Sequence, residues 1–310
     1  MRDARIAETG HADVSAGASA GEDQAMSVDF SLAERLLAAY PTRKVSTRRG
    51  TVSYREAGAG PALCLLHGIS SQSGSWVHQL DALAPRFRVV AWDAPGYGDS
   101  DRLPANAPAA SDYADSLAGL LDALGIERTL LVGSSFGALI AGAFAAARPD
   151  RAMGLVLLSP AGGYGTADPS EREAKLAGRL QRLARLGPQG LARDLPAGML
   201  SHRASAEARA LAAWSTARIR PDGYSQAART LADGRLIEDA HKYPGPVLVV
   251  AGTEDEITPP AGSERIARAF QRGSFRLIEN AGHLCLLDMP AVVNSAIAGM
   301  AQRCLEGAYP

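Results

Sequence analysis

Residues 129–147 have the sequence TLLVGSSFGALIAGAFAAA, in which the pentapeptide Gly133-Ser134-Ser135-Phe136-Gly137 separates an apolar run from an alanine-rich run. The first run is typical of a buried strand and the second of a helix. A G-x-S-x-G pentapeptide between a strand and a helix predicts a nucleophile elbow, a turn so tight that Ser135 is exposed at its apex. The glycines give the backbone room for this turn, and the helix directs its first N–H groups at Ser135. An ordinary strand–loop–helix turn with an unused serine is the alternative interpretation.

Two later segments supply the residue types that a serine nucleophile needs. The apolar run 246–251 is followed by Gly252-Thr253-Glu254-Asp255, and the strand-like run 274–278 is followed closely by Ala281-Gly282-His283. Open α/β sheets place their chemistry at the carboxyl ends of the strands. We therefore expect Asp255 and His283 to lie near Ser135, in the chain order serine, acid, histidine.

The chain resembles the α/β-hydrolase-fold enzymes, because further motifs occur in the order of that family. Leu66-His67-Gly68 ends an early strand, and residues 92–100, WDAPGYGDS, follow the next one. Together with the elbow, the G-x-x-D turn and the A-G-H turn, the resemblance covers about residues 43–163 and 241–303. It implies an α/β fold with a mostly parallel eight-stranded sheet, flanked by helices and carrying an inserted helical cap.

The resemblance assigns a role to each candidate catalytic residue. Ser135 is the nucleophile, His283 the general base and then acid, and Asp255 the carboxylate that orients the imidazole. An alcohol is a poor nucleophile at neutral pH, so a base must take its proton during attack, and histidine titrates in the right range. Two backbone N–H groups, those of Phe136 and Ile69, are expected to form the oxyanion hole.

Other residues near these motifs compete for the same roles. Glu254 and Glu256 are rival acids on the same turn, but the G-x-x-D offset favours Asp255, and the simplest interpretation of both glutamates is solvated loop charge. Of the six histidines, only His283 and His67 follow strands in family motifs. His67 is expected to shape the loop before the oxyanion hole.

The residues of the motifs favour one reaction class within the family. A serine at the elbow disfavours the haloalkane dehalogenase and epoxide hydrolase branches, which use a carboxylate there. The loop after His67-Gly68 lacks the glycines and proline of an H-G-G-P-G motif, which argues against a proline-iminopeptidase-like enzyme. The prediction is hydrolysis of a small carboxylic ester or lactone through an acyl-enzyme, without cofactor or metal. The alternatives are a meta-cleavage-type C–C hydrolase, a cofactor-free perhydrolase, and a ligand-binding receptor with negligible turnover.

The pattern of apolar residues predicts alternating strands and helices in the core. Strand-like segments lie at residues 43–48, 51–57, 62–66, 87–92, 129–134, 154–159, 246–251 and 274–278, and helical ones at 31–40, 73–84, 112–125, 136–147, 261–271 and 290–303.

Three regions of the chain are expected to differ in organisation. Residues 1–25, rich in Ala, Gly and Asp, are predicted to be a disordered tail. Residues 26–163 and 241–310 form the predicted core, and residues 164–240 the predicted cap. The cap contains only helical patterns, at residues 170–186, 189–200, 205–219 and 222–233, with a capping box that begins at Ser170.

The predicted cap carries more positive than negative charge. Residues 171–240 include twelve Lys and Arg against eight Asp and Glu, whereas the whole chain has a net charge of -1. Solvated helix faces are the simplest explanation. The functional alternative is attraction of an anionic substrate, such as a lactone or ester with a free carboxylate, through cap arginines such as Arg203 or Arg218. This alternative would suit the 3-oxoadipate enol-lactonase-like or carboxylesterase-like branch. Trp214 and Met199 are candidate substrate contacts.

Composition narrows the possible partners and the compartment. A net charge of -1 over 310 residues gives no support for a nucleic-acid or anionic-membrane partner. The three cysteines are an odd number without metal-like spacing, so a reducing, cytoplasmic setting is the simplest prediction. No apolar run has the length of a membrane span. A small-molecule substrate is the expected partner, and the sequence does not indicate the oligomeric state.

Overall fold

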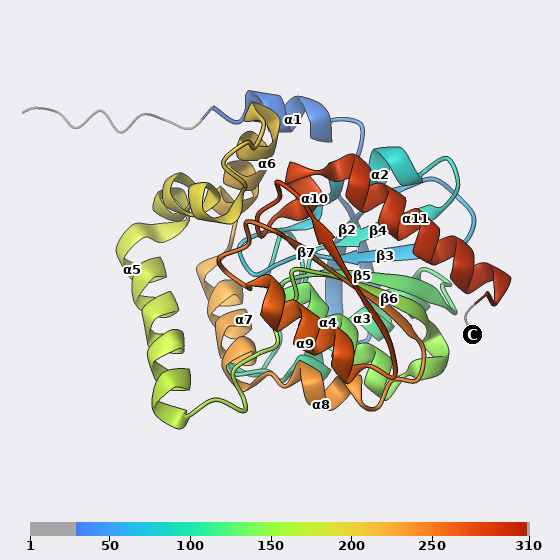
Figure 1. Ribbon diagram of the computed structural model, residues 1–310. Helices are drawn as coiled ribbons and strands as arrows, with labels where there is room; N and C mark the ends of the chain where they lie inside the picture. The colour runs from blue at the N-terminus through green and yellow to red at the C-terminus, as the bar shows by residue number, and fades with distance from the viewer. Residues whose placement is uncertain (1–28, 309–310) are drawn as a thin grey trace, which may run out of the picture.

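The computed structural model describes residues 29–308, so the predicted tail at residues 1–25 lies outside the described part of the chain. Eight strands are present, and from the third strand onward they alternate with helices, as the sequence predicts (Figure 1). The strands are β1 (Arg43–Thr47), β2 (Gly50–Ala57), β3 (Ala62–Leu66), β4 (Arg88–Trp92), β5 (Thr129–Ser134), β6 (Ala152–Leu158), β7 (Pro246–Gly252) and β8 (Arg272–Ile278). The α-helices are α1 (Ser31–Leu37), α2 (Val77–Leu83), α3 (Ala110–Ala123), α4 (Phe136–Ala147), α5 (Pro169–Met199), α6 (Ala206–Ala217), α7 (Pro221–Asp233), α8 (Leu236–Ala240), α9 (Pro260–Ala269), α10 (Cys285–Asp288) and α11 (Pro290–Glu306).

The strands form one sheet in the order β1-β2-β4-β3-β5-β6-β7-β8. β2 pairs antiparallel with both β1 and β4, and every other neighbouring pair is parallel. The predicted fold class is therefore confirmed. Because β3, β5, β7 and β8 run in one direction, the loops after them leave the same edge of the sheet, where an open α/β sheet carries its site.

The inner strands β3 to β7 are buried on both faces, and this explains their continuous apolar sequences, whereas the edge strands β1 and β8 are largely exposed. Side chains alternate along β3, with Leu63 and Leu65 packing among the side chains of α2 and α11 and with Cys64 and Leu66 packing among those of α3 and α4. Two hydrophobic layers thus enclose the sheet, and the motif loops protrude from a rigid frame.

Only helices, α5 to α8, lie between β6 and β7, at the place expected of the cap. Figure 1 shows α5 on the outer side of α7, away from the sheet. The helix α5 covers both predicted segments 170–186 and 189–200, but its backbone is not helical at Gly187, where φ is 60° and ψ is 178°. A proline at 188 follows, and its ring fixes φ and removes an N–H donor, so the helix bends between the two segments.

The start of α5 differs from the expected capping box. Asp168, and not Ser170, is the N-cap, and its side chain accepts a hydrogen bond from the Ser170 backbone N–H at 3.0 Å. Pro169 occupies the first helical position, where a missing N–H costs nothing.

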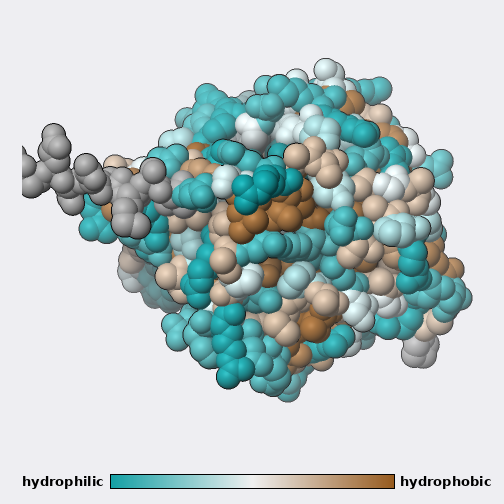
Figure 2. All heavy atoms as spheres, turned by 90° about the horizontal axis from the view of Figure 1, so that it is seen from above, coloured by the Kyte–Doolittle hydropathy of each residue, from teal (hydrophilic) through white to brown (hydrophobic). Residues whose placement is uncertain are grey.

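The outer surface is mostly hydrophilic in the view of Figure 2, with a hydrophobic patch near the centre and smaller hydrophobic areas below it and at the right-hand side. Within residues 29–308, no helix has the length and hydropathy needed to cross a bilayer.

Candidate active site

Ser135 lies in a strained turn between β5 and α4. Its φ of 51° and ψ of -111° place it outside the regions that side-chain-bearing residues usually adopt. The chain can approach itself this closely only because two glycines flank the turn. A Cβ on Gly133 would lie 2.5 Å from the Gly137 carbonyl oxygen, and a Cβ on Gly137 would lie 2.1 Å from the Leu66 carbonyl oxygen. Backbone strain of this kind is typical of functional sites and requires a rigid surrounding structure.

Asp255 and His283 form a buried hydrogen-bonded pair at the ends of β7 and β8. His283 Nδ1 lies 3.1 Å from both carboxylate oxygens of Asp255, and the two side chains are almost completely buried. Because a carboxylate only accepts, Nδ1 carries the proton of this bond and Nε2 is left unprotonated in the neutral ring. The pair thus has the tautomer that a general base requires.

The loop after β7 holds the Asp255 carboxylate in place. The backbone N–H groups of Ile257 and Thr258 donate to Oδ1 at 3.0 and 2.9 Å. Burial alone would raise the pKa of Asp255, but the hydrogen bonds from His283 and Thr258 outweigh it and keep this pKa below its ordinary value. Asp255 is therefore ionised at neutral pH.

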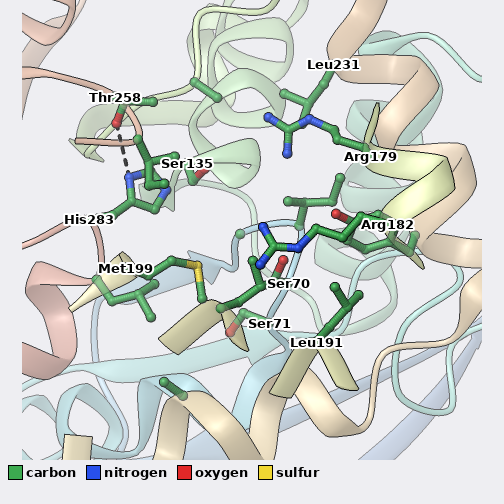
Figure 3. Close-up of a pocket in the computed structure, with 18 of the residues that line it drawn as sticks. Ser70, Ser71, Ser135, Arg179, Arg182, Leu191, Met199, Leu231, Thr258 and His283 are labelled. Atoms are coloured by element: carbon green, nitrogen blue, oxygen red, sulfur yellow. Dashed lines mark hydrogen bonds between the residues drawn. The ribbon is translucent and has the colours of Figure 1, made fainter. Parts of the chain in front are cut away.

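Thr258 is a member of the site that the sequence analysis missed. Its hydroxyl lies 2.9 Å from Asp255 Oδ2 and 3.1 Å from His283 Nδ1, the contact drawn in Figure 3. Its position three residues after Asp255 on the same turn is the signal that would have indicated it.

The two rival acids of this turn, Glu254 and Glu256, have other surroundings than Asp255. Glu256 is exposed. Glu254 is not simply the solvated charge that we expected, because Oε2 accepts from His202 Nδ1 at 2.7 Å and from the His202 backbone N–H at 3.0 Å. It joins the turn after β7 to the segment that follows α5.

Ser135 and His283 line the same cavity of about 400 Å³ (Figure 3). Within the described part of the chain, no hydrogen bond joins the Ser135 hydroxyl to His283. In unliganded hydrolases this bond is often long and shortens only when substrate binds.

The candidate oxyanion-hole donors are available in this state. Neither the Phe136 nor the Ile69 backbone N–H donates to another group of residues 29–308. Phe136 is the first residue of α4, and Ile69 lines the cavity beside Ser135. A Cβ on Gly68 would lie 3.3 Å from that of Ser135, so the two loops are in close contact.

His67 links the loops after β3 and β4. Its Nε2 accepts from the Ala94 backbone N–H at 3.0 Å, and its Nδ1 donates to the Gly68 carbonyl at 2.8 Å. Burial lowers the pKa of His67, so the ring is neutral at pH 7. It supports the Ile69 loop, as the sequence analysis expected, and makes no contact with the Asp255–His283 pair.

The cap supplies most of the wall opposite Ser135. Met199 lines the cavity as expected, together with Leu191, Leu195 and Leu231. Trp214 does not line it; this side chain packs behind the wall, with the Arg218 guanidinium 4.4 Å from its ring centroid.

Asp288 joins the cap to the loop that carries His283. Its Oδ2 accepts from the Gly282 backbone N–H at 2.8 Å and from the Ser201 backbone N–H at 2.9 Å. The Leu284 N–H also donates to the Met199 carbonyl at 2.9 Å. Two of these bonds, Ser201 to Asp288 and Leu284 to Met199, hold the end of α5 against the His283 loop, and no sequence motif predicted them.

Comparison with known proteins agrees with the fold. The model of the alpha/beta hydrolase fold family matches residues 61–290. An uncharacterized protein of Mycobacterium tuberculosis (strain ATCC 25618 / H37Rv) is 32% identical over 276 residues, which are 81% of this chain and 78% of that protein. The (E)-2-((N-methylformamido)methylene)succinate hydrolase of Acinetobacter baylyi is 28% identical over 261 residues, 83% of this chain and 95% of that enzyme. Among solved structures, a thermophilic esterase from Thermogutta terrifontis with malate bound superposes with a TM-score of 0.76 at 27% identity, and the match covers 85% of this chain and 99% of the esterase.

Proposed function

The chain belongs to the alpha/beta hydrolase fold family, and on that basis we propose that it is a serine hydrolase that cleaves a small carboxylic ester or lactone through an acyl-enzyme. The observation that carries the proposal is the buried Asp255–His283 pair, which lines one cavity with the strained Ser135. The esterase and the succinate-derivative hydrolase among its relatives support a hydrolytic reaction.

The first half of the proposed reaction acylates Ser135. Its Oγ attacks the substrate carbonyl carbon while His283 Nε2 takes the hydroxyl proton. The negative charge on the former carbonyl oxygen is stabilised by the N–H groups of Phe136 and Ile69. The tetrahedral intermediate collapses by breaking the carbon–oxygen bond to the alcohol, which leaves with the proton from His283.

The second half restores the enzyme. A water molecule gives a proton to His283 and attacks the acyl carbon, and the collapse of this second intermediate returns the proton to Ser135 Oγ. The Asp255 carboxylate stabilises the imidazolium in both halves and stays ionised, in keeping with its lowered pKa. The chemistry proposed for these residues needs no cofactor or metal.

A labelling experiment tests the nucleophile. Ser135 of the wild type is expected to react with a fluorophosphonate probe and to support hydrolysis of short 4-nitrophenyl esters. In Ser135→Ala, labelling should be lost and kcat should fall by roughly 10³- to 10⁶-fold, since the attacking oxygen is absent. Ser134→Ala is the matched control, because it removes a hydroxyl one residue away, and it should remain labelled.

Three outcomes would contradict the proposal in different ways. Labelling of Ser135→Ala at another serine would reject the nucleophile. Loss of a meta-cleavage dienoate's absorbance, without ester hydrolysis, would indicate C–C cleavage. Tight ligand binding without turnover of any ester or lactone would indicate a receptor.

A further inference from the structure

One face of α5 carries positive charge into the candidate active site. Lys175, Arg179 and Arg182 are spaced four and three residues apart, so they lie on the same side of the helix. All three line the cavity that contains Ser135 and His283. Figure 3 shows Arg179 and Arg182 extending from the cap into this cavity.

Two of these three cations have acidic partners at the rim. Lys175 Nζ lies 3.6 Å from Glu171, and Arg182 lies 3.8 Å from Asp194. All four side chains are more than two-fifths exposed, so water screens these pairs.

Arg179 is different, because it has no acidic partner among residues 29–308. It donates to the hydroxyl of Tyr164, at 3.2 Å, and the phenol of Tyr224 is a second hydrogen-bond neighbour of the same guanidinium. Both tyrosines also line the cavity.

The surroundings of Arg179 make it energetically unfavourable to leave its charge without an acidic partner. Neighbouring lining residues include Leu191, Leu195 and Leu231, so the guanidinium faces a largely apolar wall. An arginine cannot lose its proton in a protein, and a partly buried charge is unfavourable unless it is paired. A negative group in the cavity would pair with it.

We propose that Arg179 and the Tyr164 hydroxyl bind a carboxylate of the substrate at the end of the pocket away from the scissile bond. The substrate is then a small ester or lactone that carries one free carboxylate. This inference rests on the proposed function and names its substrate class. One unpaired cation favours a single negative charge over a phosphate dianion, and the two fork nitrogens of a guanidinium match the two oxygens of a carboxylate.

The cap arginines named from the sequence do not have this role. Arg218 pairs with Glu34 at 2.8 Å and stacks on Phe30, and Arg203 donates to His202 at 3.2 Å. Neither lines the cavity. Charge counting indicated the right region, but helix spacing was the signal that would have identified the residue.

Two substrates that differ in one group provide the test. In mono-4-nitrophenyl glutarate the acyl chain ends in a carboxylate, and in 4-nitrophenyl pentanoate a methyl group takes its place. The wild type should show a kcat/KM at least about 10-fold higher for the glutarate. In Arg179→Gln that value should fall about 10- to 100-fold, mainly through KM, as expected for loss of a charge-assisted contact. The pentanoate value should stay within about twofold.

Two further variants control for charge and fold. Arg185→Gln removes an exposed arginine of the same helix that does not line the cavity, and it should leave kcat/KM unchanged for both substrates. Arg179→Lys keeps the charge without the fork and should retain part of the preference for the glutarate.

The outcomes separate this inference from the proposed function. The carboxylate site would be overturned if kcat/KM fell equally for both substrates in Arg179→Gln and Arg179→Lys, or if the wild type did not prefer the glutarate. Ser135-dependent hydrolysis would still stand in either case. Absence of any Ser135-dependent hydrolysis would overturn the proposed function itself.

Discussion

The two sides of the cavity differ in how their polar groups are satisfied. On the sheet side, the Asp255 carboxylate accepts hydrogen bonds from His283, Thr258 and the backbone of Ile257. On the cap side, Arg179 meets only phenol groups. The Asp255–His283 pair on the sheet side has its hydrogen-bond partners without a ligand, whereas Arg179 on the cap side lacks a negative partner among the described residues. The difference suggests that the core organises the chemistry in advance and that the cap selects the substrate.

The largest effect should come from disturbing the sheet side. Asp255→Asn should lower kcat by on the order of 10⁴-fold, because the amide can favour the wrong imidazole tautomer without changing the shape of the site. Steady-state hydrolysis of a neutral 4-nitrophenyl ester measures this. KM should change little, since Asp255 does not line the cavity.

Glu256→Gln is the matched control for this prediction. It removes an exposed carboxylate from the next position of the same turn and should leave kcat within about twofold. If this control lost activity and Asp255→Asn did not, our assignment of the acid would be wrong.

The second-largest expected effect is on the stability of the fold. It compares Gly137, at the sheet edge, with Gly198, in the cap. Gly137→Ala would place a Cβ 2.1 Å from the Leu66 carbonyl oxygen, and relieving that overlap should destabilise the fold by about 1–3 kcal/mol or more. Gly198→Ala, on α5, meets no atom within 4 Å and should stabilise the fold by about 0.5–1 kcal/mol. Urea unfolding followed by circular dichroism measures both free energies. Tolerance of Gly137→Ala would contradict the idea that close packing at the elbow requires glycine.

Most of the fold could be predicted from the sequence because local patterns determine it. Buried parallel strands have continuous apolar runs, and all eight expected strands occur within two residues of their predicted ends. The short helices α8 and α10 were missed, since four or five residues show no helical period. The sequence predicted two helices, at residues 170–186 and 189–200. The gap between them includes Gly187, where α5 bends.

The site could be predicted only where its residues belong to motifs. Ser135, Asp255 and His283 follow strand ends, so the topology alone brings them to one edge. Arg179 lines the cavity from a cap helix and Asp288 bonds across the cap–core boundary, and the local sequence does not determine how a cap helix is oriented on the sheet. A count of charges therefore identified the cap but selected Arg203 and Arg218, which face other neighbours.

The smallest expected effect is on the pH dependence of the free energy of unfolding. It concerns Asp288, which holds the cap against the His283 loop. Burial raises the pKa of Asp288 above its ordinary value, although hydrogen bonds from Gly282 and Ser201 oppose this. A carboxyl with a raised folded-state pKa binds its proton more tightly in the folded state than in the unfolded one. Its contribution to stability should therefore decrease as the pH rises from about 3.9 through the raised pKa.

The contribution of Asp255 to stability should change with pH in the opposite direction. Its folded-state pKa is lowered, so its contribution is present above about 3.9 and is lost as the pH falls through the lowered value. Urea unfolding of the wild type, Asp288→Asn and Asp255→Asn, at a series of pH values from about 3 to 7, separates the two contributions.

Subtracting the curve of Asp288→Asn from that of the wild type should leave a free energy of unfolding that decreases with rising pH. The same subtraction for Asp255→Asn should leave one that increases. If the Asp288 difference also increased with pH, its hydrogen bonds to Gly282 and Ser201 would outweigh the cost of burial. The link between cap and core would then be an ionic one that tightens at neutral pH, and the cap would be as firmly organised as the sheet edge.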